Sequence, residues 1–89
     1  MWFVYILKCK NEFLYTGITT NLERRFQEHL KREAHFTSYN PPLSIAYTES
    51  HPTRSAALKR EAGIKKLPRT QKLALISKNP AHPLINSND

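Results

Sequence analysis

The sequence predicts a small α+β fold in which helices flank a three-stranded antiparallel sheet, with the element order β-β-α-β-α-α. Three observations support this prediction. Two apolar runs, at residues 2–7 and 13–18, are separated by a short polar segment, apolar residues recur at every fourth position over residues 22–30, and residues 43–47 alternate in polarity. The chain has 89 residues, which is enough for one compact domain.

The first two strands are predicted from the runs WFVYIL at residues 2–7 and FLYTGI at residues 13–18. The first run is continuously apolar and aromatic, which is typical of a strand covered on both faces. The polar stretch between the runs contains Asn11, which can adopt a turn conformation. Because this connection is short, we expect the two strands to form an antiparallel hairpin.

The predicted hairpin brings two tyrosines together. If the chain turns near Lys10, Tyr5 and Tyr15 lie almost opposite each other and share one face of the sheet. Aromatic pairs of this kind usually serve packing, but a tyrosine hydroxyl on a wet face can also donate or accept a proton. Gly17, one of two glycines in the chain, predicts a bend or a close approach of another group to the backbone.

The first helix is predicted to begin after Asn21, a favoured N-cap residue, and to end near Arg32. Its expected buried stripe consists of Leu22, Phe26 and Leu30. At about 100° per residue, Arg25 and His29 lie along the edge of this stripe, one turn apart. Arg25 either lays its aliphatic stem over the core with its head in solvent or faces a functional site.

The remaining elements follow a loop that ends in two prolines. Residues 43–47 predict the third strand, Thr53 caps a second helix, and Pro68 separates that helix from a third. The expected buried residues are Ala57, Leu58, Ala62 and Ile64 in the second helix, and Leu73, Leu75 and Ile76 in the third. We expect one domain over residues 1–79 and a flexible tail over residues 80–89.

An acidic residue, Glu61, falls in the apolar face of the second helix, between Ala57 and Ile64. Burying an unpaired carboxylate costs several kcal/mol, so Glu61 requires a cation or a position at the mouth of a cleft. Two partners suit it: a structural arginine such as Arg25, or a hard divalent ion such as Mg2+ or Mn2+. The sequence leaves both alternatives open.

The composition is basic and poor in cysteine. Fourteen Lys and Arg against seven Asp and Glu give a net charge of +7, which favours nucleic acid as a partner, although a basic surface can also serve solubility alone. No segment approaches the ~20 apolar residues of a membrane span, and residues 1–7 lack the features of a signal peptide. The single Cys9 excludes an internal disulfide and fits a reducing cytoplasm, and with four His it makes no familiar zinc site.

Five features, in order and at consistent spacing, make the sequence similar to the GIY-YIG nuclease family. They are Phe3-Val4-Tyr5, Tyr15-Thr16-Gly17, Arg25 ten residues after the second tyrosine, His29 one helical turn later, and Glu61 within residues 60–67. Asn79 is matched to a late asparagine of the family. The likeness extends to small standalone bacterial members and to the nuclease domain of structure-specific resolving endonucleases. Phe3 replaces the leading glycine of the first motif, and Ile18 stands where repair members carry a lysine.

The resemblance implies hydrolysis of phosphodiester bonds by in-line attack of water, with a single Mg2+ or Mn2+ ion held by Glu61. Arg25 would contact the non-bridging phosphate oxygens, and the helices that carry Arg25 and Glu61 would converge on the sheet face of the two tyrosines. Tyr5 or Tyr15 would deprotonate the water, and the sequence does not say which. His29 would hydrogen-bond a tyrosine or the phosphate, or would be a half-buried packing residue.

Basic residues that suit contacts with a phosphate backbone surround Glu61. They are Lys59, Arg60, Lys65, Lys66 and Arg69. Such contacts carry little sequence information, so we expect a nucleic acid, DNA ahead of RNA, to be recognised by its shape and with a strong salt dependence. The same residues would otherwise form a solvated helix face. Two competing hypotheses are a binding module of this fold that cuts slowly or not at all, and an interaction protein whose basic surface meets an acidic protein partner.

Overall fold

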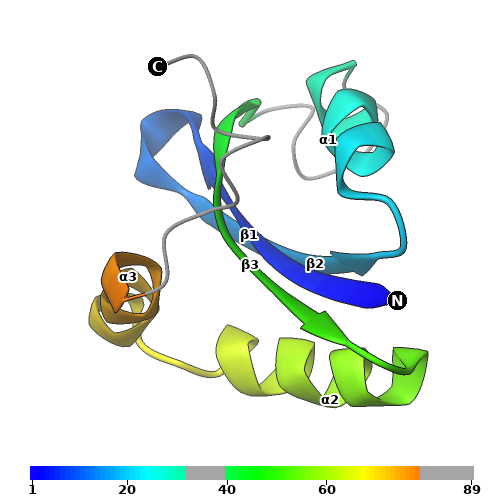
Figure 1. Cartoon of the computed structure of the whole chain (residues 1–89). Helices are drawn as coiled ribbons and strands as arrows, with labels where there is room; N and C mark the ends of the chain where they lie inside the picture. Colours follow the sequence, from blue (N-terminus) through cyan, green and yellow to red (C-terminus); the bar gives the residue numbers. More distant parts are fainter. Residues whose placement is uncertain (32–39, 79–89) are drawn as a thin grey trace.

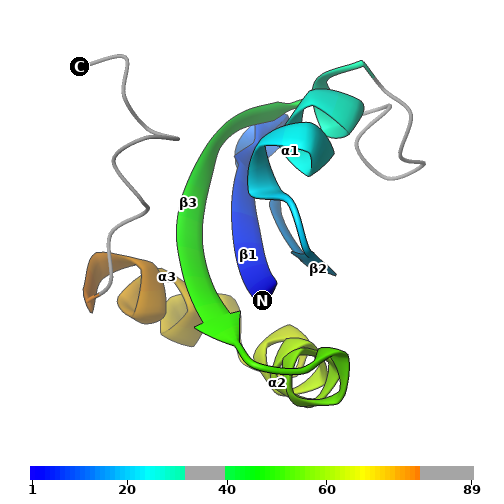
Figure 2. The same ribbon diagram turned by 45° about the vertical axis from the view of Figure 1, so that its right-hand side comes forward.

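The structure is a computed structural model that describes residues 1–31 and 40–78. A three-stranded antiparallel sheet with the strand order β2-β1-β3 lies at its centre. Helix α1 covers one face of the sheet, and helices α2 and α3 lie on the other (Figure 1, Figure 2). The predicted α+β class and the predicted order of elements are confirmed.

The strands and helices have the following bounds. The strands are β1 at Trp2–Cys9, β2 at Leu14–Thr19 and β3 at Pro42–His51, and the helices are α1 at Leu22–Leu30, α2 at Arg54–Lys65 and α3 at Arg69–Lys78. A short 3-10 turn, Lys10–Glu12, joins β1 to β2. Strand β3 continues well past Tyr47, where the sequence analysis ended it, and α1 ends at Leu30 rather than near Arg32.

Side chains cap helices α1 and α2 at their N-termini. The Asn21 side-chain oxygen accepts a hydrogen bond from the backbone N–H of Arg24 at 2.9 Å, and the Thr53 hydroxyl accepts one from the backbone N–H of Ala56 at 3.1 Å. Both predicted caps are therefore confirmed. Since Pro68 has no N–H to continue α2, it separates α2 from α3.

The hairpin register places the two tyrosines diagonally on one face. Asn11 adopts a left-handed conformation with φ of 63°, so the turn is centred on Asn11 rather than on Lys10. Tyr5 consequently pairs with Gly17, and Tyr15 pairs with Leu7. The prediction that both tyrosines share a face is confirmed, but they are not opposite each other.

Alternate residues of β1 contribute to two separate cores. Val4 and Ile6 pack with Tyr47 of β3 and with the residues Ala57 and Ile64 of α2. On the opposite face, a second core consists of Tyr5, Leu7, Cys9 and Ile45, against which Leu22 and Phe26 of α1 pack. Helices α1 and α2 therefore stabilise opposite faces of β1.

Four predicted core residues are exposed instead. Leu30 is 42%, Leu58 is 36% and Leu73 is 42% exposed, and Ala62 is exposed as well. In α1 the place expected for Leu30 is taken by His29, which is 0% exposed. The buried side of α2 is narrower than the sequence analysis expected, since only Ala57 and Ile64 are fully buried in it.

Some predictions fall on parts of the chain outside the described ranges. These are Asn79, the flexible tail at residues 80–89 and the domain boundary at residue 79, which stay predictions. None of the helices within residues 1–31 and 40–78 has the length and apolarity needed to cross a membrane.

Candidate active site

Two tyrosines and a histidine meet on the face of the sheet that α1 covers. The Tyr5 hydroxyl lies 3.0 Å from Nε2 of His29, within hydrogen-bonding distance. The ring centroid of Tyr15 lies 5.1 Å from that of His29 and 6.3 Å from that of Tyr5. Tyr5 is 2% exposed, while Tyr15 is only half-buried. We call these three residues, together with Gly17, the tyrosine cluster.

Gly17 makes room for the tyrosine cluster. A Cβ atom at this position would lie 2.5 Å from the Tyr5 hydroxyl oxygen, 2.7 Å from Cζ of Tyr5 and 3.2 Å from Cε2 of Tyr15. Because its φ is not positive, Gly17 is needed for the absence of a side chain rather than for backbone freedom. The predicted close approach to this glycine is confirmed.

Burial keeps the hydrogen-bonded pair neutral. Burial raises the pKa of Tyr5 to about 12, and the hydrogen bond with Arg25 offsets only part of that shift. Burial and the nearby positive charge of Arg25 lower the pKa of His29 from 6.5 to about 4. At neutral pH the cluster therefore consists of an uncharged phenol and an uncharged imidazole.

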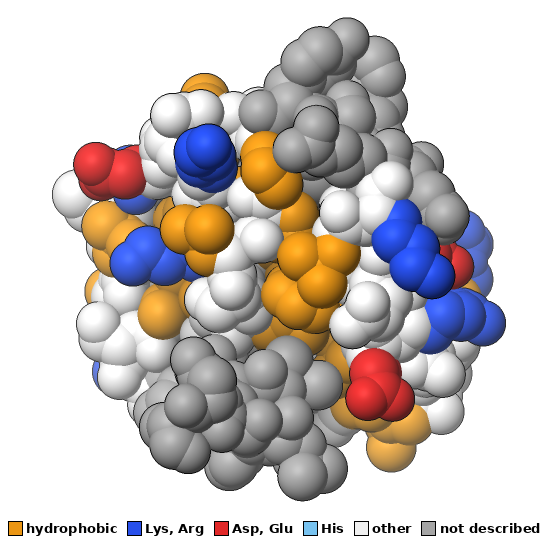
Figure 3. Space-filling model, turned by 90° about the horizontal axis from the view of Figure 1, so that it is seen from above, with side chains coloured by type: hydrophobic (Ala, Val, Ile, Leu, Met, Phe, Trp, Pro, Cys, Tyr) orange, Lys and Arg blue, Asp and Glu red, His pale blue; other side chains and the backbone are white. Residues whose placement is uncertain are grey.

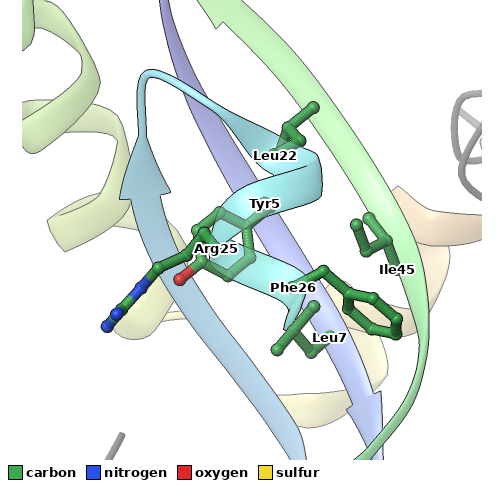
Figure 4. A pocket seen from close by; sticks show the side chains of 6 residues that line it. All are labelled: Tyr5, Leu7, Leu22, Arg25, Phe26 and Ile45. Carbon is green, nitrogen blue, oxygen red and sulfur yellow. The ribbon is translucent and has the colours of Figure 1, made fainter. Parts of the chain in front are cut away.

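Arg25 lies at the rim of the cluster, on α1. One of its Nη atoms donates to Glu28 at 2.9 Å, and both side chains are about one-third exposed, with fractions of 33% and 32%. This ion pair, above all, raises the pKa of Arg25, so the guanidinium is always charged. Figure 4 shows the guanidinium of Arg25 and the hydroxyl of Tyr5 pointing in the same direction.

A small hollow, too narrow for a water molecule, lies between α1 and the sheet beside these groups (Figure 4). Its lining residues are Tyr5, Leu7, Leu22, Arg25, Phe26 and Ile45. The apolar members lie on one side of the hollow, and the charged end of Arg25 points away from them. The hollow thus combines an apolar wall with one hydroxyl and one cation.

Glu61 lies on α2, and its side chain is 18% exposed. It makes an ion pair with Lys65 at 3.4 Å, whereas the alternative partner considered from the sequence, Arg25, pairs with Glu28. The expectation that α1 and α2 share the tyrosine face was wrong, since α2 packs on the opposite face. The Glu61 charge makes the smallest of the contributions to the raised pKa of Tyr5, which is caused above all by burial.

The described residues supply few metal-binding groups. Residues 1–31 and 40–78 contain no cluster of three or more His, Cys, Asp or Glu side chains that could hold an ion by themselves. Mg2+, however, commonly binds through one carboxylate, water and substrate phosphate oxygens. The donor set around Glu61 fits that second arrangement, in which the ion is completed by the substrate.

The basic residues predicted for phosphate binding divide into two groups. Those exposed on α2 and at the start of α3 are Lys59, Lys65, Lys66 and Arg69. Arg60 differs, because its Nε donates to both carboxylate oxygens of Glu49, at 2.9 Å and 3.2 Å. The view from above, which looks at the end of the molecule opposite α2, shows Lys and Arg side chains on both sides of a central apolar band (Figure 3).

A second polar cluster was missed by the sequence analysis. It consists of Tyr47, Glu49 and His51 of β3 together with Arg60 of α2, and we call it the Glu49 cluster. The three strand residues alternate in sequence, which is the signal of a common face. The signal was overlooked because the third strand was predicted to end at Tyr47.

This chain is similar in sequence and in structure to known proteins. The family model of the GIY-YIG catalytic domain matches residues 1–74. A UPF0213 protein of Xanthomonas axonopodis pv. citri is 42% identical over 80 residues, covering 89% of this chain and 78% of the relative. A UPF0213 protein of Syntrophus aciditrophicus is 46% identical over 80 residues, covering 88% and 92%. The solution NMR structure of a UPF0213 protein from Bacillus halodurans is 33% identical with a TM-score of 0.61, covering 99% of this chain and 95% of that chain.

Proposed function

Because the chain belongs to the family of GIY-YIG catalytic domains, we propose that it is an endonuclease that hydrolyses phosphodiester bonds in nucleic acid with one divalent metal ion. The proposed substrate is DNA ahead of RNA, recognised by its shape. The observation that carries this proposal is the tyrosine cluster, in which two hydroxyl groups and an imidazole meet beside the arginine at position 25. A packing role alone would not require a buried histidine and a side-chain-free strand position at the same place.

Arg25 is proposed to bind the scissile phosphate. Its planar guanidinium can donate two parallel hydrogen bonds to non-bridging phosphate oxygens. The ion pair with Glu28 is partly exposed, so an incoming phosphate can replace the carboxylate at little cost. The hydroxyl of Tyr5 points in the same direction and would donate to the same phosphate or to the attacking water.

The proton of the attacking water would leave through the tyrosine cluster. Tyr5 or Tyr15 would accept that proton, and the more exposed Tyr15 is the more open to water. His29 is neutral at pH 7 and lies within hydrogen-bonding distance of the Tyr5 hydroxyl, so its Nε2 can accept a hydrogen bond from that hydroxyl and orient it.

Glu61 is proposed to hold the Mg2+ or Mn2+ ion. Its present partner, Lys65, is 53% exposed, so it can turn away and leave the carboxylate to the metal. When bound, the ion supplies Lewis-acid stabilisation of negative charge on the phosphate and leaving oxygens.

Binding of the nucleic acid would depend on the exposed basic residues, Lys59, Lys65, Lys66 and Arg69. Each contact with a phosphate releases counterions, so the affinity is expected to fall steeply with salt concentration. Such contacts read the backbone and its shape rather than the bases.

The test is a cleavage assay with Mg2+ and Mn2+ on single-stranded, duplex, flapped and branched DNA and on RNA. Wild type, Glu61→Gln and the matched control Glu23→Gln, which makes the same charge change on the exposed side of α1, are purified in parallel. We expect metal-dependent cutting by wild type and the control, and its loss in Glu61→Gln. Cutting that survives in Glu61→Gln would show that Glu61 is not the metal ligand.

A binding module that cuts slowly or not at all is the second candidate. It is favoured by the pKa of Tyr5, which burial raises to about 12 and which leaves little phenolate to act as a base. It is also favoured by Ile18, which stands at the lysine position of repair members and packs against the core beneath α2. Tight, salt-sensitive binding without metal and without cutting would support this candidate and overturn the nuclease.

A further inference from the structure

The Glu49 cluster ties α2 to the edge strand β3. Both carboxylate oxygens of Glu49 are used: Oε1 accepts from the Tyr47 hydroxyl, Oε2 lies 2.6 Å from Nε2 of His51, and Arg60 donates to both. Burial would raise the pKa of Glu49, but the hydrogen bonds from these three partners lower it by more, so the group stays charged. The side chain is only 20% exposed, which strengthens the ion pair.

Apolar packing alone fixes the rotation of α2 poorly. Only Ala57 and Ile64 of this helix are fully buried, and Leu58 on its flank is 36% exposed. We call these two buried residues, Ala57 and Ile64, the seam of α2. The seam holds the helix against the sheet, but it resists rotation about the helix axis only weakly, because few side chains interlock on either side of it.

Arg60 and Glu61 lie on different flanks of this seam. Consecutive residues of a helix are about 100° apart, so a helix that turns Arg60 towards β3 turns Glu61 towards the other flank. The contacts agree with this geometry, since Arg60 reaches Glu49 on β3, while α2 also contacts β2 at the other edge of the sheet.

We propose that Glu49 is a positioning residue: by holding Arg60, it fixes the rotation of α2 and keeps the Glu61 carboxylate directed towards the β2 edge of the sheet, the strand that carries Tyr15. The inference rests on the proposed function, in which Glu61 holds the metal ion. It gives Arg60 a role in the architecture of the site, whereas the sequence analysis counted it among the phosphate contacts.

The positioning role predicts a loss of metal affinity from a residue that touches no metal. We expect Glu49→Gln, which keeps the size of the side chain but removes its charge, to weaken Mn2+ binding and to lower kcat by about 10- to 100-fold. KM for the nucleic acid should stay unchanged, because the exposed lysines are untouched. Glu23→Gln, with the same change in net charge, should match wild type in all three quantities.

Arg60→Lys provides the second variant, because its 40% exposed position tolerates substitution and lysine cannot reproduce the donor geometry of arginine. It should lower Mn2+ affinity as Glu49→Gln does, and combining the two changes should cost little more than either alone. Mn2+ affinity is measured by electron paramagnetic resonance, and circular dichroism checks the fold. The non-additive loss is the signature of two residues acting through one contact.

Two results in the variants would overturn the inference. One is wild-type Mn2+ affinity and kcat in folded Glu49→Gln. The other is an Arg60→Lys variant that changes only nucleic-acid affinity and its salt dependence, which would make Arg60 a phosphate contact. A wild type that binds Mn2+ through Glu61 but cuts nothing would remove the proposed function alone, and Mn2+ affinity would still decide the inference. Absence of Glu61-dependent Mn2+ binding in wild type would overturn both.

Discussion

The two faces of the sheet carry clusters of similar residues that are bonded in different ways. Each cluster contains tyrosine, histidine and arginine within reach of one another. In the Glu49 cluster the arginine, the histidine and the tyrosine all bond to one carboxylate. In the tyrosine cluster no carboxylate lies between the tyrosine and the histidine, and Arg25 bonds to a partly exposed glutamate beside it.

This difference separates a structural role from a chemical one. A mostly buried carboxylate that receives bonds from three side chains is satisfied, and replacing any partner is costly. Arg25 and Glu61 instead have exposed ionic partners, Glu28 and Lys65, which a substrate or an ion can displace. The bonds of the Glu49 cluster thus hold the geometry, whereas Arg25 and Glu61, on helices that cover opposite faces, keep ionic partners that can be exchanged.

The largest effect on kcat is expected when Arg25 is replaced. Arg25→Ala should lower kcat by about 100- to 1000-fold, because a donor aimed at the charge that develops on the phosphate is lost. Glu28→Gln is the control: it removes the displaceable partner, so kcat should stay at or above the wild-type value. Single-turnover cleavage measures both. A decrease of only a few-fold in Arg25→Ala would contradict the assignment of Arg25 to the phosphate.

The neutral histidine predicts a pH dependence of stability. Because the pKa of His29 falls from 6.5 in the unfolded chain to about 4 in the fold, the unfolded chain binds the extra proton first as the pH falls. Stability that is complete above pH 6.5 should therefore decrease towards pH 4, by at most about 3 kcal/mol. Urea unfolding at pH 7.5 and pH 4 measures this loss.

The matched variant for this measurement is His29→Gln, which cannot titrate but can still accept a hydrogen bond from Tyr5. Its stability should change less between the two pH values than that of wild type. If the free energy of unfolding changes equally with pH in wild type and in His29→Gln, His29 is not held neutral in the fold. The contrast between the two clusters would then be weaker.

The two glycines offer the smallest and most direct contrast. Gly17→Ala should destabilise the fold by about 1–3 kcal/mol and impair cleavage, because the new methyl group overlaps the Tyr5 hydroxyl. Gly63→Ala should stabilise it by about 0.5–1 kcal/mol and leave cleavage unchanged, because no atom lies within 4 Å of the new Cβ. Thermal unfolding and the cleavage assay check both variants. Destabilisation by both variants to the same extent would contradict the close packing assigned to Gly17.

The elements of the fold were predictable because each depends on local pattern. Asn21 and Thr53 cap their helices through contacts only three residues away, and Pro68 interrupts the chain by itself. The burial of His29 was not predictable in the same way. It depends on the hydroxyl of Tyr5, which is 24 residues away in sequence, and no helical periodicity carries that information.

The position of Glu61 shows the same limit. The helical wheel correctly placed Glu61 near the buried seam of α2, but a wheel does not say which face of the sheet the helix covers. That choice depends on the residues Val4 and Ile6 of β1, which pack with α2, and on the contact between Arg60 and Glu49. Both involve pairings between distant segments.

The turn at Asn11 has a consequence for changes in chain length. Gly17 lies beneath Tyr5 only because the pairing of β1 with β2 is centred on Asn11. Inserting or deleting one residue in the turn would turn the whole of β2 over, so that Tyr15 and Gly17 would face α2 and Thr16 and Ile18 would face α1. The face of the sheet on which Tyr15 and Gly17 lie thus depends on whether the length of the turn changes by an even or an odd number of residues. A change of two residues keeps that face, and a change of one reverses it.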